Sequence, residues 1–511
     1  MIELSAAQVA SATGGRPVAA VDATVTGPVV VDSRLVEEGS LFVALPGEHA
    51  DGADFAAGAV TDGAALILAN RELAGSDGQP LPVVVVDDVQ AALGDLARYV
   101  MARARELNPA LQVVAITGSV GKTTTKDLIG QLLTEGRDGF GGETIVPVGS
   151  FNNEIGLPLS VLKVTATTQY ADLEMGADRP GDIGHLARIA PPNIGIVLAV
   201  GTAHMEGFGS REAIADAKAE MLAELLPGGV AVLNADDHRV AAMTSRIADG
   251  RRVVTFGRAE TADICAENVS LDPLGRASFS LCVHGGVIPD VTEPQRHAVH
   301  LQIVGEHHVS NALAAASAAI LAGIPIDVVA ARLSAARIVS AHRMAVTERL
   351  DGITVIDDAY NANPESMRAA LQAVATVAAR DRRSVAVLGE MLELGDNALA
   401  AHDEIGRLAV RLNIGLLLVV GPGARHIFEG AQQEGSWGDE AVYVDDVDAA
   451  RIQLAARLRP GDVVLVKASN GTRLWQLGDD LADGMLSPAA SSTVSSTAET
   501  HTIEGEEVNA A

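Results

Sequence analysis

Short apolar runs alternate with helical segments along the chain, and changes in this rhythm divide it into three parts. In the first part, a capping-box pattern at residues 5–8 predicts a helix that ends at Gly14-Gly15. A longer helix is predicted over residues 89–107, where Asn108-Pro109 breaks it. Four apolar runs typical of short strands lie between these helices, at residues 29–31, 41–44, 65–68 and 83–86. We therefore place a first domain at residues 1–108.

From residue 113 the order becomes strand, glycine loop, helix, and helices are predicted at 123–133 and 309–322. The run 113–116 has no polar alternation, as expected for a strand covered on both faces. Similar runs follow at residues 194–200, 230–233 and 253–256. Residues 262–304 instead show alternating short strands and turn residues, which indicates an antiparallel flap. We place this second domain at residues 109–340.

A third α/β pattern begins near residue 340, with predicted strands at 353–356, 385–388, 416–420 and 463–466. Helical segments separate these strands, which favours a parallel sheet. We place the third domain at residues 341–486. The tail, residues 487–511, is rich in Ser, Thr, Ala and Glu without an apolar period, so we expect it to be disordered. The predicted fold class is α/β with three domains.

Composition narrows the classes of function. Apolar residues make up 48 % of the 511 residues, which is enough for packed cores. The net charge, 37 − 66 = −29, opposes binding to nucleic acid or anionic lipid, and no basic patch offsets it. The two cysteines, Cys265 and Cys282, have no CxxC spacing, which argues against a disulfide scaffold or a thiolate zinc site. Apolar runs such as 414–420 are far shorter than the ~20 residues that span a bilayer. We find no targeting segment and expect a cytoplasmic protein that is not embedded in a membrane.

A candidate phosphate-binding loop directly follows the strand at 113–116. Its glycines let backbone N–H groups face inward, the next helix contributes the positive end of its dipole, and Lys122 offers a cation to phosphate oxygens. The Thr123 hydroxyl suits Mg²⁺. Ile116 stands where the general motif has its first glycine, so Gly118 gives a shorter GxxGK[ST] variant; the alternative is an ordinary glycine turn before a helix. The predicted ATP-binding loop consists of Thr117, Gly118, Ser119, Val120, Gly121, Lys122, Thr123 and Thr124.

Two candidate metal ligands lie near the ends of predicted strands. Glu174 stands among apolar residues at one strand end, and His204 follows the strand at 194–200. Open α/β sheets bind ligands at the carboxyl ends of their strands, so both side chains could face a nucleotide-bound metal. Taken alone, Glu174 could equally be a salt-bridge partner and His204 a loop residue. Lys218 lies on an acid-rich helical segment, where a solvated, ion-paired lysine is the ordinary interpretation.

Together these motifs resemble the Mur ligase family, the ATP-dependent amide-bond ligases of peptidoglycan precursor synthesis, over residues 1–485. The resemblance implies an N-terminal UDP-binding domain, a central P-loop domain with a mostly parallel sheet, and a C-terminal Rossmann-like domain. It also implies ATP and Mg²⁺ as cofactors and a lysine carbamylated by CO₂. The implied metal ligands are Thr123, Glu174, His204 and, as its carbamate, Lys218. The implied catalytic residues are Lys122, Lys218, Glu174 and His204. The further implied ATP-binding residues are His307 and Asn311 of a GxHxxxN motif, Arg343, Asp358 and Asn361.

Within the family, the motifs at residues 357–367 and 388–395 resemble the branch that adds D-alanyl-D-alanine to a UDP-N-acetylmuramoyl-tripeptide. The branch that adds a diamino acid normally carries an Asp-Asn-Pro-Arg segment, which this sequence lacks. Two departures from the family pattern stand out. The segment 467–470 reads Lys-Ala-Ser-Asn instead of Lys-Gly-Ser-Arg, so that a basic contact to the substrate is either missing or supplied by Arg473. His308 stands where Asn is common. The implied contacts to the UDP substrate come from Ser33, Arg34, Asn152 and Asn153.

The implied reaction transfers the γ-phosphate of ATP to the tripeptide carboxylate, after which the amine of D-alanyl-D-alanine displaces phosphate. Two alternatives stay open: a related ligase that adds a diamino acid or glutamate, and a P-loop ATPase switch without a ligase product. His402-Asp403 is a candidate base, although a helix start is the more ordinary interpretation. We expect a monomer that closes on ATP through hinges near residues 108 and 340. The sequence leaves open whether the third peptide residue is lysine or diaminopimelate.

Overall fold

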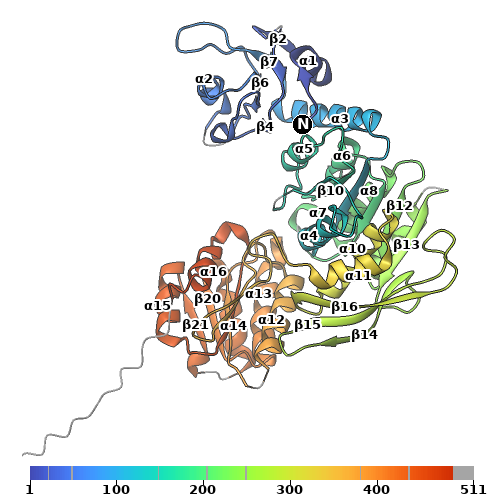
Figure 1. The fold of residues 1–511 in the computed structure, drawn as a ribbon. Coiled ribbons are helices and arrows are strands. Elements are labelled where there is room, and N and C mark those ends of the chain that lie inside the picture. Colours follow the sequence, from blue (N-terminus) through green and yellow to red (C-terminus); the bar gives the residue numbers. More distant parts are fainter. Residues whose placement is uncertain are drawn as a thin grey trace, which may run out of the picture.

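Three α/β bodies follow one another along the chain in the computed structural model (Figure 1). The structure describes residues 1–486 except 21, 48–49, 148, 203–204, 248–249, 380 and 436–437. The predicted disordered tail, residues 487–511, lies outside the described residues. Within the described part of the chain, no helix is both long and apolar enough to cross a bilayer.

The N-terminal body is built on a five-stranded sheet in the order β2-β7-β6-β5-β4, with a separate β1-β3 pair. Ser5 and Gln8 form the predicted capping box on helix α1, and Gly14 ends this helix at φ +65°. Helix α3 has the predicted bounds and begins at Asp88, whose carboxylate accepts a hydrogen bond from the Ala91 backbone N–H. The elements are β1 (Leu4–Ser5), α1 (Ala6–Thr13), β2 (Arg16–Val18), β3 (Thr24–Val25), β4 (Val29–Val30), the 3-10 turns Ser33–Leu35 and Gly52–Phe55, β5 (Leu41–Val43), α2 (Ala56–Thr61), β6 (Leu66–Ala69), β7 (Val83–Val85) and α3 (Val89–Leu107).

The central body has a nine-stranded sheet in the order β16-β15-β14-β13-β12-β11-β8-β10-β9. The strands from β9 to β14 are parallel, whereas β14, β15 and β16 pair in antiparallel fashion, which confirms the predicted flap. The elements are β8 (Gln112–Thr117), α4 (Lys122–Leu133), β9 (Thr144–Ile145), α5 (Gly156–Val161), β10 (Tyr170–Glu174), α6 (Asp182–Ile189), β11 (Ile194–Val197), α7 (Met205–Phe208), α8 (Arg211–Ala223), β12 (Val230–Asn234), α9 (His238–Ala242), the 3-10 turn Met243–Arg246, β13 (Arg252–Gly257), β14 (Ile264–Leu271), β15 (Arg276–Val283), β16 (Gln295–Val304), α10 (His308–Leu321) and α11 (Ile326–Ala335).

The C-terminal body has a six-stranded sheet in the order β17-β18-β22-β19-β20-β21. All its pairings are parallel except that of β17, an edge strand absent from the sequence-based prediction, as is β21 at the other edge. The elements are β17 (Ala345–Glu348), β18 (Thr354–Asp357), α12 (Pro364–Ala378), β19 (Ser384–Leu388), α13 (Ala398–Arg411), β20 (Leu416–Val420), α14 (Arg425–Glu434), β21 (Ala441–Val444), α15 (Val447–Arg457), β22 (Val463–Lys467), α16 (Trp475–Ala482) and the 3-10 turns Gly395–Asn397, Pro422–Ala424, Gly438–Glu440 and Asn470–Thr472.

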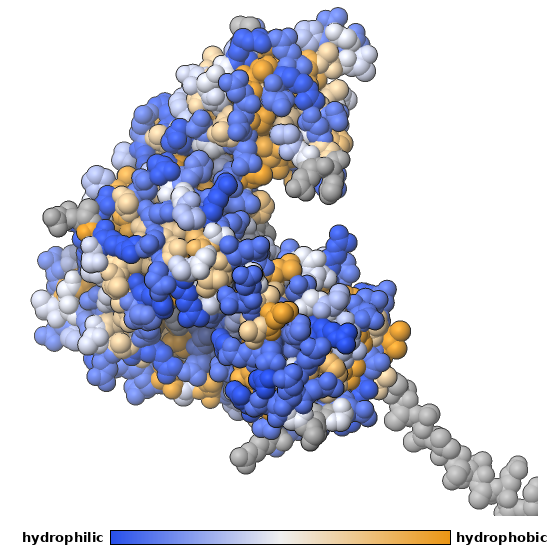
Figure 2. Space-filling view, turned by 180° about the vertical axis from the view of Figure 1, so that it is seen from behind, coloured by the Kyte–Doolittle hydropathy of each residue, from blue (hydrophilic) through white to orange (hydrophobic). Residues whose placement is uncertain are grey.

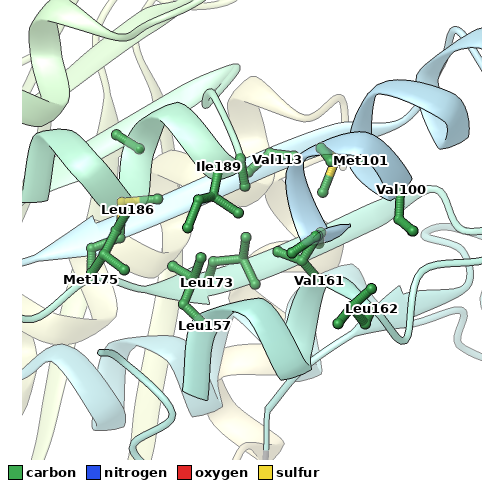
Figure 3. Packing of buried hydrophobic residues seen from close by; sticks show 14 of the residues in the cluster. Val100, Met101, Val113, Leu157, Val161, Leu162, Leu173, Met175, Leu186 and Ile189 are labelled. Carbon is green, nitrogen blue, oxygen red and sulfur yellow. The ribbon is translucent and has the colours of Figure 1, made fainter. Parts of the chain in front are cut away.

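One apolar core continues across residue 108, from the N-terminal body into the central body. In Figure 3, Met101 of α3 lies near Val113 of β8 and Val161 of α5, and all three belong to one buried cluster. Helix α3 therefore shares its apolar surface between both bodies. The two bodies are joined by a common core, which opposes free rotation at residue 108.

Figure 2 shows the molecule from behind, where a wide notch separates the N-terminal body from the C-terminal body. The C-terminal body is connected to the central body through the segment that follows α11. This arrangement leaves the carboxyl end of the central sheet between the two outer bodies, where a site can receive residues from more than one domain.

Candidate functional site

The predicted phosphate loop joins β8 to α4, and it has the geometry of an anion-binding turn. Gly121 has φ +83°, and a Cβ at this position would lie 2.4 Å from Asn311 Oδ1 on α10, so only glycine fits there. Lys122 Nζ donates a hydrogen bond to the Gly118 carbonyl at 2.8 Å. Burial lowers the pKa of Lys122, and the carboxylate of Glu174 opposes this effect. The loop thus holds a cation at the start of a helix, where an anion is favoured.

Oxygen atoms gather beside this loop because β10 runs parallel to β8, with Glu174 opposite Ile116. Thr123 Oγ1 donates to Glu174 Oε2 at 2.9 Å and lies 2.8 Å from Ser150 Oγ. Asn152 Nδ2 donates to the other oxygen of the Glu174 carboxylate at 2.7 Å. Glu174 is 1 % exposed, so its carboxylate is held without contact with bulk water. Hydroxyl and carboxylate oxygens are the ligands that Mg²⁺ prefers, and this cluster fits such an ion.

Lys218 is buried on α8, so the sequence-based interpretation of a solvated lysine is wrong. Its exposed fraction is 6 %, because α8 turns this face toward the sheet and the phosphate loop. Burial, with a smaller contribution from the charge of Lys122, lowers the pKa of Lys218 from 10.5 to about 7. A lysine with this pKa is neutral to a substantial extent near pH 7, whereas an exposed lysine is almost fully protonated. The third predicted metal ligand, His204, lies outside the described residues.

A cavity of about 480 Å³ lies over the phosphate loop and receives side chains from the central and C-terminal bodies. The predicted residues Thr117 and Gly118 lie in the loop beneath it, and Lys218, Ser33, Arg34 and Asn153 are outside its lining. Its lining includes most of the predicted ATP-binding residues, namely Ser119, Val120, Gly121, Lys122, Thr123, Thr124, His307, Asn311, Arg343, Asp358 and Asn361, together with Asn152 and Glu174.

The C-terminal side of this cavity is held by two cations. Arg343 lies over the ring of Tyr360, 4.1 Å from its centroid, and donates from Nη2 to Ser150 Oγ at 3.1 Å. Lys467 is buried and donates to Asp358 Oδ2 at 2.6 Å and to the Asn361 carbonyl at 2.7 Å. Arg343 therefore links the C-terminal body to the oxygen atoms around Glu174. Lys467 holds the loop that carries the predicted residues Asp358 and Asn361.

Several cavity residues were missed by sequence reasoning. Glu365, in the first turn of α12, accepts a hydrogen bond from Thr202 Oγ1 at 2.9 Å and lies 3.8 Å from Arg211 in the central body. The sequence could have indicated Glu365 as a site residue, because it follows the carboxyl end of β18, where open α/β sheets bind ligands. Lys467 belongs to the segment 467–470 compared with the family pattern, and Ser150 lies two residues before Asn152, but only the tertiary contacts show that both reach the cavity.

The two departures from the family pattern have local structural explanations. Ala468 is buried against Gly389, where an added Cβ would lie 2.7 Å from the Ala468 Cβ. Arg473 is exposed and does not line the cavity, so it does not replace the basic contact there. His308 is buried with Nδ1 3.1 Å from Asn311 Nδ2, and burial lowers the pKa of His308 well below its usual value. The neutral ring of His308 thus supports the asparagine that faces Gly121.

The remaining candidates have other partners. Arg34 is exposed and pairs with Asp32 at 2.6 Å in the N-terminal body. Asn153 Oδ1 accepts a hydrogen bond from the Gly156 backbone N–H at 2.9 Å, at the start of α5. The candidate base His402 lies inside α13 rather than at its start, accepts from the Met391 backbone N–H at 2.9 Å and contacts the Ala398 carbonyl at 2.7 Å. Both ring nitrogens are engaged away from the cavity, so His402 has a structural role.

Comparison with known proteins adds to this geometry. Residues 28–100, 116–319 and 342–470 match the models described as Mur ligase family, catalytic domain; Mur ligase middle domain; and Mur ligase, glutamate ligase domain. The UDP-N-acetylmuramoyl-tripeptide–D-alanyl-D-alanine ligase of Mycobacterium tuberculosis is 48 % identical, over 94 % of this chain and 98 % of the relative. MurF from Acinetobacter baumannii has a TM-score of 0.79 at 30 % identity, covering 94 % of this chain and 99 % of its own. The MurF ligase from Thermotoga maritima in complex with ADP has a TM-score of 0.73 at 29 % identity, covering 90 % and 98 %.

Proposed function

Because this chain belongs to the Mur ligase family, we propose that it joins D-alanyl-D-alanine to UDP-N-acetylmuramoyl-tripeptide, the two substrates in the name of its relative at 48 % identity. We propose that ATP drives this reaction, which the solved MurF complex with ADP supports. The observation that carries this proposal is the single cavity in which the phosphate loop, the Glu174 oxygen cluster and Arg343 of the C-terminal body meet. The proposed division of labour follows the domains: residues 1–108 hold the UDP moiety, 109–340 the ATP phosphates, and 341–486 the adenine edge and the amine substrate.

The first chemical step must bring two anions together. A carboxylate oxygen of the tripeptide attacks the γ-phosphorus of ATP, and the bond from that phosphorus to the bridging oxygen breaks. ADP leaves with the bridging oxygen, and the tripeptide becomes an acyl phosphate. Two like charges about 4 Å apart repel by ~4 kcal/mol at an effective dielectric of about 20. Lys122 and Arg343 offset this repulsion, and the loop N–H groups orient the triphosphate for in-line attack.

Magnesium fits the oxygen cluster, and we propose Thr123 and Glu174 as ligands, with His204 and the carbamate of Lys218 as further ligands. When bound, Mg²⁺ neutralises phosphate charge. The ammonium form of Lys218 would repel a cation. Its neutral amine can instead add to CO₂ and release one proton, and the pKa of about 7 makes that form available. Asn152 holds the Glu174 carboxylate in place through its hydrogen bond at 2.7 Å.

In the second step the neutral amine of D-alanyl-D-alanine attacks the acyl carbon and an amide bond forms. The bond from this carbon to the oxygen that carries phosphorus breaks, phosphate leaves with that oxygen, and the amine gives up one proton. Water must be excluded, because it would hydrolyse the acyl phosphate. Tyr360 and Glu365 lie at the part of the cavity contributed by the C-terminal body, where the amine substrate is proposed to bind. We further propose that the enzyme acts as a monomer in the cytoplasm, where ATP and UDP-linked precursors are available.

Isotope transfer tests the reaction directly. Tripeptide substrate labelled with ¹⁸O in its acceptor carboxylate is incubated with ATP, Mg²⁺ and D-alanyl-D-alanine, and the phosphate released is analysed by mass spectrometry. We expect one labelled oxygen in each phosphate and ADP release that requires both substrates. Other dipeptides, diamino acids and glutamate serve as controls for the amine. The second labelled oxygen should remain in the amide carbonyl of the product. Released phosphate without label, or ADP release that needs no acceptor, would contradict the ligase and favour the ATPase switch.

A further inference from the structure

Two cysteines and a histidine that the reaction does not use meet on one face of the antiparallel flap. Cys265 on β14 lies opposite Cys282 on β15, and His284 follows Cys282 by two residues, so its side chain points to the same face. The ligand atoms of these three residues lie within 4.8 Å of one another. Cys265 is 2 % exposed and Cys282 is 0 % exposed, whereas His284 is half-buried and opens the group to solvent.

The hydrogen-bond pattern of the two strands shows how these thiols are spaced. The His284 backbone N–H donates to the Asp263 carbonyl at 2.9 Å, so residues 263 and 284 form a hydrogen-bonded antiparallel pair. Such pairs recur at every second position, which makes Cys265 and Cys282 another one. Cβ atoms in these pairs lie near the upper end of the roughly 4.5–5.5 Å range, whereas a disulfide needs ~3.5–4.5 Å. The spacing suits an atom held between the sulfurs better than a bond between them.

We propose that Cys265, Cys282 and His284 bind one thiophilic divalent cation of the Zn²⁺ type, with the fourth position taken by Glu267 or water. Two thiolates and an imidazole form a donor set that selects Zn²⁺ over Mg²⁺. Glu267 lies two residues after Cys265 on the same face and now pairs with Arg296 at 2.9 Å. Binding forms two sulfur–metal bonds and one nitrogen–metal bond and releases the two thiol protons to solvent.

The protonation of the pair agrees with this exchange. Burial and the neighbouring Cys282 raise the pKa of Cys265 to about 12, and burial also raises the pKa of Cys282. Burial therefore favours the neutral thiol form of both side chains in the absence of a cation.

This group is separate from the ATP cavity, because none of its residues lines that cavity. It lies where β14 begins and β15 ends, and Ala262 packs against the two thiols. The other end of the same two strands reaches the C-terminal body, where a Cβ on Gly275 would lie 3.1 Å from a Val377 methyl of α12. A bound cation would fasten the free end of the flap and leave the ligase chemistry unchanged.

Cobalt titration of the full chain tests the proposal. The protein is stripped of metal with a chelator, Mg²⁺ and ADP are added to occupy the nucleotide site, and Co²⁺ is titrated while absorption is recorded. We expect one equivalent of Co²⁺ to give thiolate charge-transfer and tetrahedral d–d bands, which Zn²⁺ removes. Cys282→Ser should abolish the bands. His284→Ala should weaken binding by at least the roughly ten-fold that the loss of a supporting partner costs.

His297→Ala is the matched control, because His297 lies opposite Leu281 and so on the other face of the sheet. It should bind Co²⁺ like the unchanged protein, and Cys282→Ser should keep its ligase rate. The proposal would be overturned if no thiolate bands appear, or if the bands persist in Cys282→Ser. It would also be overturned if the two thiols react with a thiol reagent only after reduction, because they would then form a disulfide. If Cys282→Ser does not fold, protection of both thiols from alkylation by Zn²⁺ in the unchanged protein decides the question: unprotected thiols would refute it.

Discussion

At the scale of single residues, the lysines are distributed unusually. The sequence holds five: Lys122, Lys126, Lys163, Lys218 and Lys467. Three of them are buried, Lys122 is half-buried in the phosphate loop, and only Lys163 is exposed, while arginine supplies the other 32 of the 37 basic residues. Arginine stays charged when buried, whereas lysine can lose its proton or be carbamylated. Most lysines of this chain therefore lie at positions shielded from solvent, among them Lys218 with its lowered pKa.

Replacing Lys122 tests the role of the phosphate loop. We expect Lys122→Ala to lower the rate of ADP release with all substrates present by at least ~100-fold, because a cation aimed at the transferring phosphoryl group is lost. Its side chain makes one hydrogen bond, to Gly118, so folding should be little affected, which thermal unfolding checks. Lys163→Ala is the matched control. Equal rates in both variants would contradict the assignment.

The pKa of Lys218 gives a pH prediction. Folding lowers this pKa from 10.5 to about 7, so the amine becomes mostly neutral as pH rises through 7. Carbamate forms from the neutral amine and releases a proton, so at limiting CO₂ the ligase rate should fall as pH drops below about 7 and recover with added bicarbonate.

Lys218→Ala supplies the control for that titration. It should be inactive in bicarbonate and should regain activity with a short-chain carboxylate, which replaces the anionic ligand. Full activity of this variant without any carboxylate would exclude the carbamate.

At the scale of elements, helix α4 connects the phosphate loop to the segment that leads into the C-terminal body. Asp127 on α4 accepts hydrogen bonds from the Ser340 backbone N–H at 2.8 Å and from Ser340 Oγ at 3.0 Å, and it pairs with Lys126 at 3.0 Å. The helix that begins with Lys122 is therefore tied to residue 340 by a buried carboxylate. If nucleotide binding moves the loop, we expect this contact to transmit the movement to residue 340.

The contribution of the Asp127–Ser340 hydrogen bonds to the stability of the fold can be measured. Asp127→Ala should lower the free energy of unfolding by about 2–3 kcal/mol, because charged hydrogen bonds are lost and buried donors are left unpaired. Denaturation by urea measures the change. Asp95→Ala, which removes an exposed pair with Arg98, should change it by less than ~1 kcal/mol. Similar values for the two variants would show that Asp127 does not stabilise the connection.

Prediction from sequence succeeded where the signal was local. The phosphate loop was recognisable because the strand, the glycines, Lys122 and the helix are adjacent in the chain. The edge strand β17 was not recognisable from the sequence, because its residues alternate between half-buried and exposed positions and the strand pairs with only one neighbour. Lys218 and the Cys265–Cys282 pair were misjudged or missed for another reason: helix orientation and strand register decide burial and contact, and spacing along one chain does not encode them.

At the scale of the whole molecule, the three bodies are joined unequally. The N-terminal and central bodies share the large core that crosses residue 108. The C-terminal body instead meets the central body at Val304 of β16, which joins the C-terminal core, and through polar contacts such as Asn363 Nδ2 to the Ser119 carbonyl at 3.5 Å. Of the two hinges expected from the sequence, the structure therefore favours the one near residue 340.

Paired spin labels test this inference about domain movement. Cysteines at the exposed positions Leu35, Lys163 and Ile452 place one label in each body, and the two native cysteines are buried from reagents. On adding a non-hydrolysable ATP analogue and UDP-tripeptide, the Lys163–Ile452 distance should shorten and the Leu35–Lys163 distance should stay constant. A change confined to the Leu35–Lys163 pair would place the hinge at 108 instead.

The solitary surface lysine has a practical consequence for handling the molecule. Amine-directed coupling chemistry meets Lys163, just after α5, together with the α-amino group of Met1, while the other lysines are shielded by the fold. Attachment to a sensor chip or a fluorophore by this route would occur at one of these two amines and leave the buried lysines unmodified.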